Sequence, residues 1–365
     1  MKNIWMAFLL VLCFAIPVSA QTDVTQDIVD EVISETQALN TPGFNFAETA
    51  QKAADGTLTF SFEDCIRRFV GLLTDEVKSN AATLIKMLVL AVLAGILCNL
   101  QENLPTGGVN EISFLACFAL IAGLSVTIIA EILETANNTI DTILVLIAGL
   151  MPTMAGLTVS TSAAAMAGFY PTLFIAMQSF VAICKNIFLP LIMVITSLSV
   201  INAISGRFQV SRLIEFARQV IKWGLGLLLT VFVGILNIHC FTAKAAGTVA
   251  GRTVKYALCN FIPMVGNVLA ESAEAVISSI RILRGALGIS GILAVVSLCV
   301  LPIVKILATS VLYRFAAAIA EPATDKRIIQ LLMDLAGNIT LTFAILLMVA
   351  VMFIISIALL CMLLV

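Results

Sequence analysis

The chain has few charges and almost no histidine. Charged residues make up 12% of its 365 residues, about half the share found in soluble domains. His239 is the one histidine, which argues against a zinc site built on histidines. The nine cysteines stand singly, without a Cys-x-x-Cys pair. We therefore expect no metal centre and no cofactor, and the net charge of −2 gives no reason to expect a nucleic-acid partner.

Most catalytic motifs are absent from the sequence as well. It has neither a Walker lysine loop nor a His-Glu-x-x-His motif, so it lacks the usual means of hydrolysing ATP or a peptide bond. One enzyme-like motif is present, Gly-Ile-Ser-Gly at 288–291, the form that rhomboid-type intramembrane serine proteases use. Ser290 would then be the nucleophile and His239 its base, but their order is reversed and a base must lie within hydrogen-bond reach. We predict a non-enzyme, with intramembrane proteolysis as a remote alternative.

Long hydrophobic runs are what the chain has in abundance. Hydrophobic residues make up 61% of it and the mean hydropathy is +1.10. Runs close to the 20 residues that cross a bilayer recur along its length. The sequence predicts an all-α, polytopic helical membrane protein with six to seven transmembrane helices plus interfacial amphipathic helices. A re-entrant segment at 142–168 would give six spans, and a full crossing there would give seven. The expected spans cover residues 81–100, 112–133, 142–159, 172–204, 224–238, 289–312 and 340–365.

Three regions precede or make up this membrane part. Residues 1–20 have the layout of a cleaved signal peptide, with a retained anchor as the alternative. Residues 21–80 form an extracytoplasmic amphipathic helical segment with too few large apolar side chains for a core of its own. Residues 81–365 form the polytopic membrane domain.

A clean amphipathic pattern at 212–222 predicts a helix that lies flat at a membrane interface. Shifting the sequence by 115 places four of its polar positions on Arg327, Gln330, Asp334 and Gly337. The match indicates an internal repeat of about 172–240 and 286–365, or a chance likeness between two apolar units. The polar side of the helix is formed by Arg212, Glu215, Arg218, Gln219 and Lys222, and its apolar side by Leu213, Phe216, Val220 and Trp223.

Polar residues and prolines interrupt two of the long apolar runs. Lys185 either extends to the lipid headgroups or lines a polar path through the bundle. Proline inside a run predicts a kinked helix. The candidate intramembrane polar and kink positions are Lys185, Asn186, Pro190, Pro302 and Lys305.

The stretch 243–288 lies between apolar runs but is itself polar along one side. Its segment Asn-Phe-Ile-Pro-Met-Val-Gly at 260–266 predicts the end of one helix and the start of another. Acidic and basic residues then share one helical stripe, so this helix either lies at the headgroups or faces water or a partner. The candidate partner-facing residues are Arg252, Lys255, Asn260, Pro263, Gly266, Glu271, Glu274 and Arg281.

Three of these segments resemble the stage III sporulation protein AE family of endospore-forming bacteria. They are residues 88–101, residues 247–255 and the Asn-Phe-Ile-Pro-x-Val-Gly segment at 260–266, which is followed by Glu271 and Glu274. The resemblance extends over nearly the whole chain, and the 260–266 segment is its most specific part.

The resemblance implies a permease-like, non-enzymatic membrane subunit of the channel complex that links mother cell and forespore. It implies a place in the mother-cell membrane facing the forespore, and partners that include a separate cytoplasmic ATPase and the other stage III subunits. The alternative, from the repeat and from Lys185, Lys305 and Glu271 near spans, is a self-sufficient secondary transporter of a small solute.

Overall fold

A computed structural model describes residues 62–79, parts of 85–96, and residues 109–159, 169–204, 210–261, 266–322 and 324–362. The described part of the chain is helical apart from short turns. The expected signal peptide at 1–20 and residues 21–61 of the expected amphipathic segment lie outside the described residues. So does most of the expected span at 81–100.

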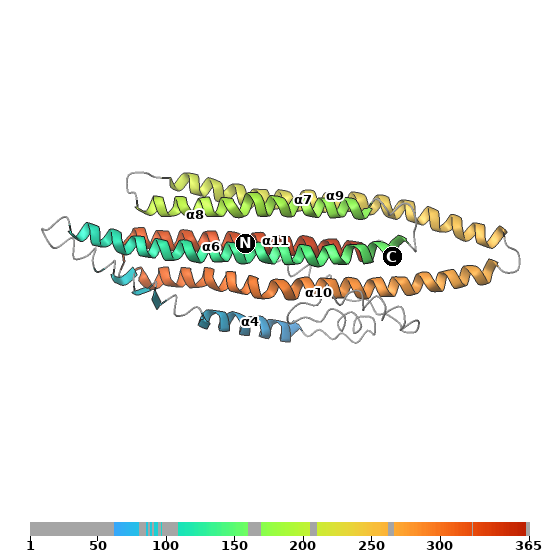
Figure 1. The fold of residues 1–365 in the computed structure, drawn as a ribbon, viewed down its shortest axis with the longest axis horizontal. Coiled ribbons are helices and arrows are strands. Elements are labelled where there is room, and N and C mark those ends of the chain that lie inside the picture. The colour runs from blue at the N-terminus through green and yellow to red at the C-terminus, as the bar shows by residue number, and fades with distance from the viewer. Residues whose placement is uncertain are drawn as a thin grey trace.

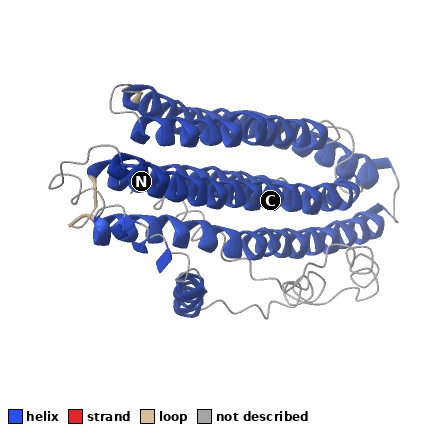
Figure 2. Cartoon of the chain, turned by 60° about the vertical axis from the view of Figure 1, so that its left-hand side comes forward, coloured by secondary structure: helices blue, strands red, loops and turns tan. Residues whose placement is uncertain are grey.

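The described helices run nearly parallel and form a layered bundle (Figures 1 and 2). In Figure 1, α7, α8 and α9 form one layer, α6 and α11 the next, and α10 a third. The short helix α4 lies beside α10 on its outer side. The helices are α4 (Phe62–Ser79), α6 (Val109–Val159), α7 (Phe169–Ile183), the π-helix η2 (Cys184–Phe188), α8 (Leu189–Ile204), α9 (Ser211–Phe261), α10 (Gly266–Ala320) and α11 (Lys326–Met362).

Five helices in the described part of the chain are long and apolar enough to cross a membrane. This confirms the predicted fold class, a polytopic all-α membrane protein. The candidate spans hold 28 to 36 residues, more than the 20 or so that a bilayer requires. They are Phe118–Pro152, Pro171–Ile204, Ser211–Ile238, Gly285–Ala320 and Lys326–Leu360.

Helix α6 differs from the predicted layout. The sequence suggested a span at 112–133 and a separate run beginning at 142, either re-entrant or a full crossing. The structure instead has one helix of 51 residues that continues through the intervening polar turns and through Pro152. An apolar helix can continue through polar residues when neighbouring helices supply partners, and Lys185 and Lys305 bind two of the acidic residues here.

The run 172–204 contains a local irregularity beside its proline, and the kink itself stays a prediction. Pro190 has no N–H and its ring collides with the carbonyl group one turn earlier. The helix widens into η2 just before this proline, and α7, η2 and α8 follow one another without a break. Phe188 of η2 lies against α9 at Gly224, where an added Cβ atom would be 2.8 Å from the Phe188 ring.

The break predicted at 260–266 is also confirmed. Helix α9 ends at Phe261 and α10 begins at Gly266. The two helices extend well past the ends of α6 and α11 and form a long hairpin (Figure 1). Within the residues whose side chains are described, the candidate spans of α9 and α10 are Ser211–Ile238 and Gly285–Ala320.

The core of the bundle surrounds α11. In the most apolar stretch of its candidate span, 67% is buried inside the protein, whereas the corresponding share for α9 is 28%. Helix α11 therefore occupies the centre and α9 the periphery, where much of its surface is available to lipid. The close contacts include Phe180 with Phe232, whose ring centroids are 5.3 Å apart in an edge-to-face arrangement.

Candidate functional site

The first turns of α9 and α11 meet through a cluster of polar side chains. Arg218 of α9 donates from Nη1 to Oδ1 of Asp334 at 2.9 Å and from Nη2 to the Asp334 carbonyl oxygen at 2.8 Å. Its Nε donates to Oδ1 of Asn338 at 3.0 Å. The side chains of Arg218 and Asp334 are only 19% and 20% exposed. A planar guanidinium group that makes three hydrogen bonds to one helix fixes both distance and rotation between α9 and α11.

The cluster continues from α11 into α8. Asn338 Nδ2 donates to Oγ1 of Thr196 at 3.1 Å, and that hydroxyl donates to the Ile192 carbonyl oxygen at 2.8 Å. Asn338 and Thr196 are both fully buried. We call Arg218, Asp334, Asn338 and Thr196 the polar cluster. Because each member has a partner, the cluster joins three helices without leaving a buried polar group unsatisfied.

The sequence placed Arg218 on the polar face of a helix lying flat on the membrane, and the structure differs. Arg218 lies in the buried stripe of α9 together with Ile214 and Ile221. The expected apolar face points outward: Phe216 is 64% exposed and Trp223 74% exposed. The amphipathic pattern is real, but of its polar side only Arg218 packs into the bundle, while the other four residues are exposed. Its apolar side is available to lipid.

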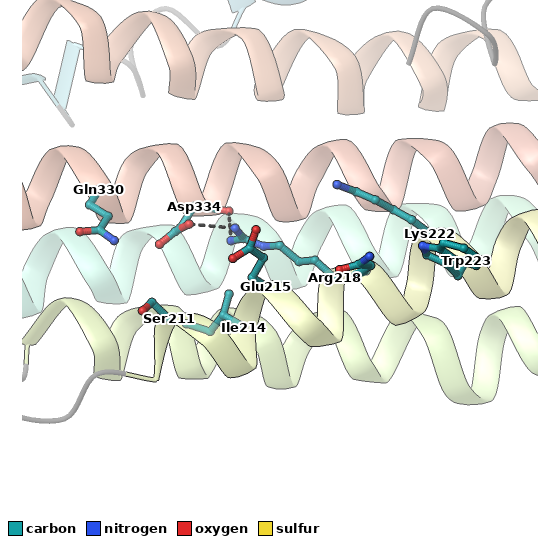
Figure 3. A pocket seen from close by; sticks show the side chains of 9 residues that line it. Ser211, Ile214, Glu215, Arg218, Lys222, Trp223, Gln330 and Asp334 are labelled. Carbon is teal, nitrogen blue, oxygen red and sulfur yellow. Dashed lines mark hydrogen bonds and ion pairs between the residues drawn. The ribbon is translucent and has the colours of Figure 1, made fainter.

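A cavity of about 580 Å³ adjoins the polar cluster. Figure 3 shows its side chains, with Arg218 directed at Asp334 and Lys222 reaching along α9 toward them. Helix α9 supplies most of the lining and α11 the remainder. The lining residues are Ser211, Ile214, Glu215, Arg218, Gln219, Lys222, Trp223, Gln330 and Asp334.

Two further ion pairs link α6 to its neighbours. Lys185 of η2 binds Asp141, and Lys305 of α10 binds Glu131 at 2.7 Å. The lysine side chains are 23% and 35% exposed. Both candidate intramembrane lysines therefore have an acidic partner on α6. These two ion pairs connect α6 to η2 and to α10.

The other candidate positions are placed as follows. Asn186 and Pro190 are exposed and Pro302 is partly buried, so the structure does not bring them into the polar cluster. Pro263 lies outside the described residues. The remaining partner-facing candidates lie in α9 or α10, but their side chains are outside the described part of the structure: Arg252, Lys255, Asn260, Gly266, Glu271, Glu274 and Arg281.

The serine of the protease-like motif is in the interior. Ser290 is 0% exposed, and its hydroxyl donates to the Leu287 carbonyl oxygen at 3.0 Å. A nucleophile needs access to its substrate, so this geometry argues against Ser290 as one.

The sequence analysis placed Arg218 and Asp334 on the polar faces of two helices but did not predict that they pair with each other. One feature of the sequence does point to this ion pair. Each lies in a long apolar helix, where a charge needs a partner of opposite sign, and the structure pairs them across the α9–α11 contact.

Five candidate spans, three of them joined by a polar cluster, define a polytopic helical membrane protein. The model of the family "Stage III sporulation protein AE" matches residues 44–363. A "Stage III sporulation protein AE" from Bacillus subtilis (strain 168) is 25% identical over 303 residues, which are 83% of this chain and 76% of that protein. No solved structure matches the chain. The chain belongs to the stage III sporulation protein AE family, as its motifs predicted.

Proposed function

We propose that this protein is a permease-like, non-enzymatic membrane subunit of the stage III sporulation complex, required for spore formation. The observation that carries the proposal is the family match over residues 44–363, which includes every candidate span and the projecting hairpin. Family membership implies a role in sporulation. We place the protein in the mother-cell membrane facing the forespore.

The shape of the bundle supports an assembly role. The hairpin of α9 and α10 extends past the ends of α6 and α11 (Figure 1), and we propose that it is available there to other proteins. This hairpin contains the motif residues Arg252, Lys255, Glu271 and Glu274. We propose that it contacts other subunits of the complex, and that a separate cytoplasmic ATPase supplies the energy.

A clean deletion of the gene tests the function. We expect unchanged vegetative growth and loss of heat-resistant spores, restored by the intact gene supplied elsewhere on the chromosome. Normal numbers of heat-resistant spores from the deletion strain would contradict the proposal. Pulling down the tagged protein from sporulating cells then tests the hairpin: the charge-removal variant Glu271→Gln/Glu274→Gln should lose partners that an Asp75→Asn control in α4 retains.

One observation favours a second function, a secondary transporter that works alone. Lys185 and Lys305 lie within candidate spans and bind acidic residues of α6, and charged groups inside membrane spans often mark solute or ion paths. Purified protein in liposomes would then move a solute without partners, and Lys305→Met would slow that movement. Solute flux only in the presence of other subunits would favour the first proposal.

A further inference from the structure

The cavity beside the polar cluster keeps one free positive and one free negative charge. Arg218 is occupied by Asp334 and Asn338. Glu215 and Lys222 also line the cavity, and neither has an ion-pair partner among the described residues. The unpaired charges of the lining are therefore a carboxylate and an ammonium group, which together suit a ligand that carries both signs.

These two charges face the same space. Glu215 and Lys222 are seven residues apart on α9, which is two helical turns or about 10 Å along the axis. In Figure 3 the side chain of Lys222 extends from α9 toward α11, and Glu215 lies further along the same helix beside Arg218. A small zwitterionic group between them would place its ammonium at Glu215 and its anion at Lys222.

The edge of the cavity is continuous with an apolar, exposed surface. Trp223 lines the cavity and is 74% exposed, and Phe216 and Val220 on the same helix are 64% and 42% exposed. All three lie in the candidate span Ser211–Ile238, so their neighbour in a membrane is lipid. A tryptophan beside a charged group is typical of the boundary where headgroups meet acyl chains. The ligand that fits has a zwitterionic head and an apolar tail.

We propose that this cavity binds the headgroup of a phosphatidylethanolamine lipid. Its primary ammonium donates hydrogen bonds to Glu215, its phosphate accepts from Lys222, and its acyl chains lie along Phe216, Val220 and Trp223. The trimethylated ammonium of phosphatidylcholine has no N–H to donate, and phosphatidylglycerol has no cation. The volume of about 580 Å³ suits a headgroup with part of the glycerol. This inference is independent of the sporulation function.

Trp223 offers a direct reporter of binding. The chain has two tryptophans, Trp5 and Trp223, so full-length Trp5→Phe protein in detergent reports from the cavity alone. Brominated phosphatidylethanolamine added in small amounts should quench Trp223 saturably. We expect about tenfold weaker quenching by brominated phosphatidylcholine and phosphatidylglycerol, the difference that one charge-assisted hydrogen bond makes.

Variants separate the two ends of the headgroup. Glu215→Gln should abolish the preference for ethanolamine over choline, and Lys222→Gln should weaken binding of every phospholipid about tenfold. Both side chains are exposed, so both variants should fold. Controls Glu321→Gln and Lys78→Gln change exposed charges away from the cavity and should bind like the parent.

Three results would overturn the proposal. Equal quenching by the three lipids would show that the cavity does not distinguish between headgroups. A preference that persists in Glu215→Gln would exclude this cavity. Displacement of the lipid by soluble glycerophosphoethanolamine at equal concentration would show that the ligand is a soluble zwitterion and not a lipid.

Discussion

The two halves of α11 are held in the bundle in different ways. Its first turns bind α9 and α8 through the hydrogen bonds of Asp334 and Asn338. From residue 339 onward the sequence has no charged residue, and the described side chains of this half are packed tightly instead. Ile357, for example, adjoins Gly291 of α10, where an added Cβ would lie 3.5 Å from its Cδ1.

The difference follows from the membrane as a solvent. Between helices in lipid there is little hydrophobic driving force, so close packing and hydrogen bonds hold them together. Packing between smooth apolar surfaces permits small rotations and shifts, whereas three hydrogen bonds from one guanidinium group specify a single register. We infer that the apolar half supplies most of the buried contact area and the polar cluster fixes how α9 is placed.

The largest expected loss of stability comes from removing Asp334, the anion that pairs with the largely buried Arg218. Asp334→Leu should destabilise the protein by about 3 kcal/mol, because Arg218 then stays in the bundle uncompensated. Unfolding in mixed detergent micelles measures the loss. Asp334→Asn keeps an acceptor and should lose less. Equal stability of Asp334→Leu and the parent would contradict the account.

Crowding a close helix contact should have the next largest effect. Gly224→Leu places a side chain against Phe188, whose ring already lies 2.8 Å from the position of an added Cβ, and should cost about 1–3 kcal/mol. Gly226→Leu is the matched control two residues away, since nothing lies within 4 Å of its added Cβ. The same unfolding assay should rank Gly224→Leu well below Gly226→Leu, and the reverse order would refute this contact.

Removing Asn338, the α11 side chain that connects α9 to α8, should lower the stability somewhat less. Asn338→Leu abolishes the hydrogen bonds to Arg218 and Thr196 and should destabilise the bundle by about 1–2 kcal/mol. Thr342→Val, one turn later on α11, is the control because the Thr342 hydroxyl binds only the Asn338 carbonyl oxygen of its own helix. If both variants unfold alike, the polar cluster does not join the helices.

The smallest effect is expected outside the bundle. Lys78 and Asp75 of α4 form an exposed pair at 3.9 Å, with side chains 73% and 76% exposed. Lys78→Ala should change stability by less than about 0.5 kcal/mol, since water screens such a pair. A loss as large as that of Asp334→Leu would show that burial does not explain the difference between the ion pairs.

Much of the fold is predictable from the sequence, and the placement of α9 is not. Apolar runs identified the membrane class, and the segment around Pro263 identified the break between α9 and α10. The pattern at 212–222, however, is the same for a helix lying on a membrane and for one that packs a single polar residue, Arg218, into a bundle. Only the position of Asp334, far away in the sequence, distinguishes the two, and periodicity carries no information about it. The continuity of α6 was missed for a similar reason, because its acidic residues have partners on other helices.

A double-mutant cycle between Arg218 and Asp334 tests the central claim most directly. Stability would be measured for the parent, Arg218→Leu, Asp334→Leu and the double variant in mixed micelles. We predict that the double variant is more stable than either single variant, with a coupling energy of about 2 kcal/mol or more, because no charge is then left alone. Losses that simply add, with no coupling, would mean that this pair does not hold α9 against α11.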